Sequence, residues 1–156
     1  MRLASTLTFA ALTTFAVPLN AQLADTKILT QQAVQTILQA ATVHAGTNKW
    51  NVSIAVVDAN GDLLAFRRLD GASLASVDIS QGKARTAARA RRATKALADA
   101  VAGGATVLLS APGLVLMQGG LPITVNGITV GAVGVSGASS EQDEQVAAAG
   151  IAALKP

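Results

Sequence analysis

The sequence contains no cysteine and no tyrosine, and its single histidine is His44. Without cysteine no disulfide can form, and one chain cannot build a zinc site of the usual His and Cys type. With one histidine, the sequence also gives no indication of a Ser-His-Asp catalytic triad. Stability must therefore come from packing of side chains and from self-association, so we expect a homo-oligomer.

Aromatic side chains are few, and only Trp50 and Phe66 lie outside the first 21 residues. The core must therefore be built by close packing of Ala, Val, Leu and Ile. Charge is nearly balanced, with 12 Lys and Arg against 9 Asp and Glu. Loss of Arg2 with a leader would reduce the net charge to +2, which gives no electrostatic reason to expect nucleic acid as a partner.

The first 21 residues have the layout of a secretory signal peptide. Arg2 precedes an apolar run from Leu7 to Val17, and a small residue stands at Ala21. The run is too short and too rich in threonine to predict a membrane span. We therefore expect cleavage after Ala21, a single domain over residues 22–156, no stable membrane insertion after cleavage, and a periplasmic or secreted protein.

The stretch from Gly119 to Asp143 carries the strongest structural signals. Two β-rich runs, Pro122–Val125 and Ile128–Val135, are separated by Asn-Gly, which favours the type I′ turn of a two-residue hairpin. In the second run two glycines leave the sheet surface open to close approach by another segment. Ser139 and Gln142 then have the spacing of a capping box, which predicts a terminal helix.

The first half predicts a helix followed by a second hairpin. Thr30 is a good N-cap, and the apolar positions after it recur at helical spacing: Ala33, Val34, Ile37, Leu38, Ala41 and Ala45. His44 falls at the edge of this apolar stripe, so we expect it to be partly buried near the helix end. Strands are predicted over Val52–Val57 and Leu63–Leu69, with Asn-Gly between them.

Two further helices are predicted over about 74–92 and 95–102. The longer one carries a stripe of small apolar residues: Ala75, Ile79, Ala84, Ala87 and Ala90. A short strand is expected near Leu114–Met117, after the interruption at Pro112-Gly113. These elements predict an α+β domain in which helices flank a five-stranded antiparallel sheet.

Two stretches carry a resemblance to a known family. They are VHAGTNKWNVSIAVVDANGDLLAFRRLDGASLASVDISQGKARTA, residues 43–87, and GGLPITVNGITVGAVGVSGASSEQDEQVAAAGIAAL, residues 119–154. Together they resemble the GlcG/HbpS family of small haem-binding proteins and the related C-terminal domain of PduO-type corrinoid adenosyltransferases. The resemblance implies a profilin-like fold, multimers and binding of haem or a similar tetrapyrrole, with a corrinoid as the alternative. The chain differs from the common family pattern in the long helix, where Arg85 and Ala90 replace expected aromatics and Ala93 replaces a common proline.

Haem iron needs an axial donor, normally His, Cys, Met or Tyr, and cations near the propionates. His44 is the leading candidate by elimination, and it also occupies the histidine of the family-like His-Ala-x-x-x-x-Trp stretch. Met117 is a second candidate ligand. Arg85 and Arg89, with Arg92 one turn further on, are candidate partners for carboxylates. The alternative readings are a packing role for His44, core filling by Met117 and a solvated helix face for the arginines.

We therefore expect an exported haem-binding or tetrapyrrole-binding protein, in haem sequestration, sensing or turnover, that is not an enzyme. Two other classes stay open. One is a small-molecule enzyme acting on an acidic metabolite, and the resemblance also allows haem degradation. The other is a non-catalytic structural or sensory partner protein.

Overall fold

The computed structural model describes residues 26–155, so the predicted signal peptide lies outside the described part. The elements follow in the order α1 (Gln31–Thr47), β1 (Ser53–Asp58), β2 (Leu63–Arg68), α2 (Ala75–Ala90), α3 (Thr94–Ala102), the 3-10 helix η2 (Thr106–Ser110), β3 (Gly120–Val125), β4 (Ile128–Ser136) and α4 (Ser140–Ala152). No helix within this range combines the length and hydropathy needed to cross a membrane.

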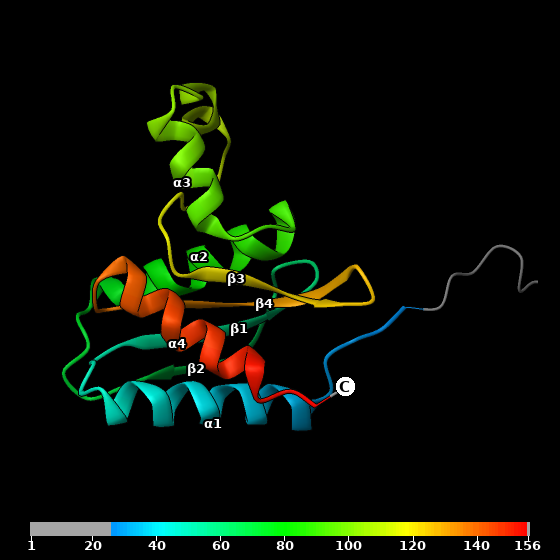
Figure 1. Ribbon diagram of the computed structural model, residues 1–156, viewed down its shortest axis with the longest axis vertical. Coiled ribbons are helices and arrows are strands. Elements are labelled where there is room, and N and C mark those ends of the chain that lie inside the picture. The colour runs from blue at the N-terminus through cyan, green and yellow to red at the C-terminus, as the bar shows by residue number, and fades with distance from the viewer. Residues whose placement is uncertain (1–25, 156) are drawn as a thin grey trace, which may run out of the picture.

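The four strands form one antiparallel sheet in the order β2-β1-β4-β3. Helices α1 and α4 cover one face and α2 covers the other (Figure 1). Helix α3 and η2 project away from this body, at the top of the view (Figure 1). The predicted α+β architecture is confirmed, whereas the profilin-like assignment stays a prediction.

Both predicted hairpins form, but their turns differ. In the β3–β4 turn Asn126 and Gly127 have φ values of +52° and +79°, as a type I′ turn requires. In the β1–β2 turn the carboxylate of Asp58 accepts N–H groups from Asn60 and Asp62, at 2.8 and 2.9 Å. Side-chain hydrogen bonds therefore help to close the β1–β2 turn, in which Gly61 supplies the positive φ of +89°.

The predicted helix caps are also confirmed. The Thr30 hydroxyl accepts the Ala33 N–H at the start of α1. At the start of α4, Ser139 and Gln142 bond reciprocally as a capping box. Both signals are local in sequence, which is why they could be recognised without tertiary information.

The predicted strand at Leu114–Met117 is wrong, and the sheet formed within residues 26–155 has four strands rather than five. The segment runs along α2 instead. The Val115 N–H donates to the Thr86 hydroxyl at 2.8 Å, and the Val115 side chain occupies the space where a Cβ of Gly82 would stand. The backbone N–H of Val115 thus has a side chain of α2 as its hydrogen-bond partner, where a strand residue would bond to the backbone of a neighbouring strand.

The buried face of α2 also differs from the predicted one. Ala84 and Ala87 are buried as expected, but Ala75 is exposed. The buried polar residues of the helix are Ser76, Ser80, Lys83 and Thr86. The cause is the strand beneath, where a Cβ at Gly134 would overlap the Ser80 carbonyl oxygen and the Ala84 nitrogen. Because α2 lies so close to β4, the polar side chains of α2 that flank its contact with β4 are buried as well.

Candidate functional site

His44 lies in the last turn of α1 and is partly buried, as predicted. Its ring meets the Trp50 ring edge to face, with centroids 5.9 Å apart and an interplanar angle of 62°. The Nε2 atom is enclosed and has no hydrogen-bond partner among residues 26–155. A buried nitrogen without a partner is uncommon in proteins, so this atom is the first candidate for a functional donor.

The end of α1 explains how Trp50 reaches His44. The backbone and side-chain N–H groups of Asn48 both donate to the His44 carbonyl oxygen, at 3.3 and 2.8 Å. Lys49 then adopts a left-handed φ of +57°, and the Trp50 N–H returns to the Ala45 carbonyl oxygen at 2.9 Å. This reversal of the chain fixes the backbone of the tryptophan beside the last turn of the helix.

Haem iron and a bare metal ion need different sets of donors from a protein. Residues 26–155 contain no group of three or more His, Asp or Glu side chains arranged to hold a metal. Haem iron receives four nitrogens from its porphyrin and needs only an axial donor from the protein. His44 carries a nitrogen of the right type for such a donor, and ligation by Nε2 would break no hydrogen bond within residues 26–155.

Arg67 on β2 lies on the same side of the sheet as His44. Its Nη1 atom donates to the Thr42 hydroxyl at 3.0 Å and to the Gln39 side chain at 3.3 Å, both on α1. Sequence reasoning did not single out this arginine. Its position could have been inferred from strand pairing, since Arg67 is the partner of Ile54, whose side chain lies in the core beneath α1.

Arg85 and Arg89 are brought together, but away from His44. They extend from α2, on the opposite face of the sheet, toward the β1–β2 turn. Arg89 Nε donates to the Asn60 carbonyl oxygen at 2.7 Å, and Arg85 Nε reaches the Gly61 carbonyl oxygen at 3.5 Å. Both side chains are exposed, so their described role is to hold this turn against α2.

Met117 likewise lies away from His44. It follows the segment that runs along α2, and its side chain is 46% exposed. The exposure does not match the alternative role of core filler. In a single chain the structure therefore brings none of the other predicted site residues to His44.

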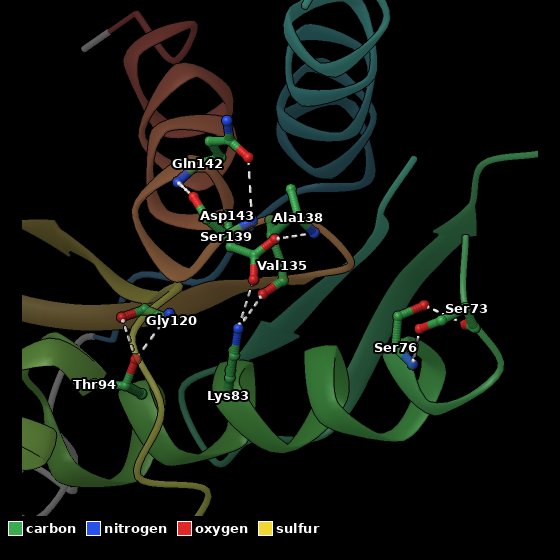
Figure 2. A network of polar contacts seen from close by, with 10 residues as sticks. All are labelled: Ser73, Ser76, Lys83, Thr94, Gly120, Val135, Ala138, Ser139, Gln142 and Asp143. Carbon is green, nitrogen blue, oxygen red and sulfur yellow. Dashed lines mark hydrogen bonds and ion pairs between the residues drawn. The ribbon is translucent and has the colours of Figure 1, made fainter. Parts of the chain in front are cut away.

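The only buried ion pair among the described residues joins Lys83 of α2 to Asp143 of α4 (Figure 2). Lys83 Nζ lies 2.8 Å from Asp143 Oδ2 and donates to the Val135 carbonyl oxygen at 2.9 Å. Asp143 Oδ1 accepts the Ala138 N–H at 3.0 Å. Nothing in the sequence pattern indicates this pair, because its members are 60 positions apart and lie on different helices.

Burial raises the pKa of the Asp143 carboxyl above its ordinary value, against the opposing effects of Lys83 and of the Ala138 N–H. Gly119 closes over the pair, since a Cβ there would stand 2.9 Å from Lys83 Nζ and 2.8 Å from Asp143 Cβ. The two charged side chains are 1% and 3% exposed. Both side chains are enclosed away from solvent, and their hydrogen bonds and ion pair connect α2, β4 and α4.

Comparison with known proteins shows the family to which this chain belongs. A family model described as "Haem degrading protein HbpS-like" matches residues 29–152, which include every described helix and strand. The chain belongs to this HbpS-like family. It is also 47% identical to Protein GlcG of Escherichia coli strain K12 over 109 residues, which cover 70% of this chain and 81% of that protein.

Two solved structures show the same family likeness. The crystal structure of a double mutant of HbpS from Streptomyces reticuli has 38% identity and a TM-score of 0.82, and the match covers 94% of this chain and 99% of that one. The crystal structure of a PduOC–haem complex has 32% identity and a TM-score of 0.75, with 82% and 96% covered. The predicted membership of the GlcG/HbpS family is confirmed.

Proposed function

We propose that this protein binds haem and that His44 supplies the axial ligand of the iron. The observation that carries the proposal is the enclosed Nε2 atom, which has no hydrogen-bond partner within residues 26–155. Similarity to HbpS and to the PduOC–haem complex supports haem as the tetrapyrrole. The PduO relationship makes a corrinoid the alternative, which a parallel titration with cobalamin tests.

The propionates of a haem at His44 need a cation on the same side of the sheet. Arg67 meets that condition, because its guanidinium already bonds to side chains of α1. Arg85 and Arg89 extend from the opposite face, so we assign them no contact with the same haem in one chain. Arginine suits carboxylates because its planar N–H groups can bind both oxygens.

Titration of the purified protein with haemin tests the proposal by two signals. The Soret band reports the iron ligand, and the fluorescence of Trp50, the single tryptophan, reports proximity to His44. We expect saturable binding with a Soret shift and quenching of Trp50. His44→Ala should weaken binding about 10-fold or more, a loss of about 1.4 kcal/mol, because the axial bond is lost.

Two further variants separate ligation from packing. Thr47→Ala is a matched control on the same turn, since its hydroxyl bonds only to the Val43 carbonyl oxygen and is exposed. His44→Cys should retain binding with a different Soret maximum, because thiolate replaces imidazole at the iron. A folded His44→Ala protein with unchanged haem affinity and spectrum would remove His44 from the site.

Haem degradation is the second candidate function, and the description of the matched family favours it. The test is to incubate the haem complex with ascorbate and oxygen and to follow the Soret band. Loss of the band together with a bilin product would favour turnover. A stable Soret band would instead favour sequestration or sensing, without turnover by the protein.

Export and self-association are also part of the proposal. Intact mass measurement of protein recovered from the periplasm or medium tests cleavage after Ala21. Self-association is supported by the projecting segment of α3 and η2, where Val107 and Leu109 are 76% and 65% exposed (Figure 1). Light scattering at micromolar concentration should give a multiple of the single-chain mass, and a single-chain mass would contradict it.

A further inference from the structure

An open apolar cleft lies at the end of α1 opposite to His44. It has a volume of about 560 Å³, within the range of small-molecule sites. Aliphatic side chains from three separate segments line it, namely Ile28 before α1, Ile123 of β3, and Ile151 and Leu154 at the end of the described chain. Ile28 is 76% exposed, so the cleft presents apolar surface to solvent that the described chain does not cover.

The wall formed by residues 27–30 is held in place by two contacts. Leu29 packs over Gly131 of β4, where a Cβ would stand only 2.5 Å from Leu29 Cδ1. Thr30 caps α1 through the Ala33 N–H, at 3.2 Å. Gly131 is one of the two glycines expected to leave the sheet surface open to close approach, and the leucine that precedes α1 is the segment that approaches it. The cleft is therefore a built feature of the fold.

The charged side chains of the cleft are all positive. Lys27 and Lys155 line it from the two ends of the described chain, and none of the acidic residues within 26–155 does so. Neither lysine forms an ion pair with another described residue. Two cations beside apolar surface complement a ligand that has an apolar body and an anionic end.

We propose that this cleft binds a small amphipathic carboxylate, of the chemical class of a medium-chain fatty acid, with its apolar chain on the aliphatic wall and its carboxylate at Lys27 and Lys155. The site is separate from the proposed haem site. His44 lies 14 residues beyond Thr30 on α1, about 21 Å along the helix. The residues that line the cleft include neither His44 nor Met117, the two candidate iron ligands.

Calorimetric titration with decanoate and with 1-decanol, both kept below aggregation, tests the proposal. Decanoate should bind with one site per chain, and the neutral alcohol should bind at least about 10-fold more weakly. The double variant Lys27→Glu/Lys155→Glu should lose about 10-fold or more in decanoate affinity. The control Lys49→Glu/Arg91→Glu makes the same change in net charge at two exposed residues outside the cleft, and should bind like the wild type.

A second variant tests the apolar wall. Ala33 lines the cleft from α1, so Ala33→Phe should fill it and weaken both probes, while circular dichroism confirms the fold. Decanoate binding unaffected by the charge variant and by Ala33→Phe would overturn the proposal. The proposal would also be overturned if the wild-type protein were an oligomer that bound no decanoate and that Ala33→Phe dissociated. In that case a second copy of the chain would cover the cleft.

The haem site and the cleft can be tested separately, because a variant that disrupts one site should leave ligand binding at the other unchanged. Decanoate should leave Trp50 fluorescence unchanged, and His44→Ala should leave decanoate affinity unchanged. The charge variant should retain the haem-induced Soret shift. Competition between haemin and decanoate at a single site would overturn the assignment of the cleft to a separate ligand.

Discussion

The two faces of the sheet are packed in different ways. Beneath α1 and α4 the core is built of branched aliphatic side chains, among them Val34, Ile37, Ile54, Val133 and Val146. Beneath α2 the apolar cluster consists mainly of alanine, and polar side chains such as Ser80 and Lys83 are buried beside it. The first face depends on buried apolar area, whereas the second depends on close approach and on satisfied polar groups.

This difference bears on function as well as on stability. His44 and the apolar cleft both belong to the face of the larger side chains, which α1 and α4 cover. The α2 face brings backbone against backbone and seals its one ion pair from solvent. Ligand chemistry is therefore expected on the first face, and sensitivity to small changes in side chains on the second.

Removal of Asp143 should have the largest effect on stability. Asp143→Ala leaves the Lys83 ammonium buried without its partner, so we expect a loss of about 3–5 kcal/mol in the free energy of unfolding. Urea denaturation measures it. Asp99→Ala is the control, since the Lys95–Asp99 pair is as short, at 2.7 Å, but 48% and 63% exposed. That control should lose about 0.5 kcal/mol or less.

The double variant Lys83→Met/Asp143→Leu distinguishes the pair from its surroundings. Replacing both charges by apolar groups removes the desolvation cost, and stability should recover most of the loss. Equally small losses in the free energy of unfolding for Asp143→Ala and Asp99→Ala would contradict the expectation that burial makes the Lys83–Asp143 pair important for stability.

Addition of one methyl group at Gly134 should destabilise the α2 face. The added Cβ would overlap the backbone of α2, so Gly134→Ala should cost about 1–3 kcal/mol in urea denaturation. Gly46→Ala is the matched control, because no atom lies within 4 Å of a Cβ there and the residue is helical. The control should be neutral or stabilising by up to about 1 kcal/mol. Equal effects at both glycines would argue against close approach as the constraint.

The pH dependence of stability should carry the signature of Asp143. Because its pKa is raised in the folded state, its contribution is fully present below the ordinary value of 3.8 and is lost as pH rises through the raised pKa. Asp143→Asn removes this titration. Between pH 3 and neutral pH, wild-type stability should therefore fall relative to that variant. A relative gain by the wild type over the same range would contradict the direction of the shift.

The smallest effect is expected at Arg89. Its exposed guanidinium holds the β1–β2 turn through the Asn60 carbonyl oxygen, so Arg89→Ala should cost about 1 kcal/mol or less in urea denaturation. Haem affinity should change less than about threefold, because Arg89 lies on the face opposite His44. A larger loss of haem affinity, comparable to that of His44→Ala, would place haem on the α2 face.

Local chemistry accounts for what could be predicted. The Asn126-Gly127 turn, the Thr30 cap and the Ser139 capping box involve residues at most three positions apart, and each was recognised from sequence. The predicted strand at Leu114–Met117 was wrong because its apolar composition does not reveal its partner. That partner is the Thr86 hydroxyl, 29 positions away from Val115.

By itself the sequence determined the hairpins, the capped starts of α1 and α4, the apolar face of α1, the family and the choice of His44 as the single histidine. Tertiary structure alone decided which polar residues are sealed in the core, that Arg67 bonds to the side chains of Thr42 and Gln39 on α1, and that Lys27 and Lys155 line one cleft. The physical reason is range. Turns and caps depend on neighbouring dihedral angles, whereas burial and charge pairing depend on segments that only the folded sheet brings together.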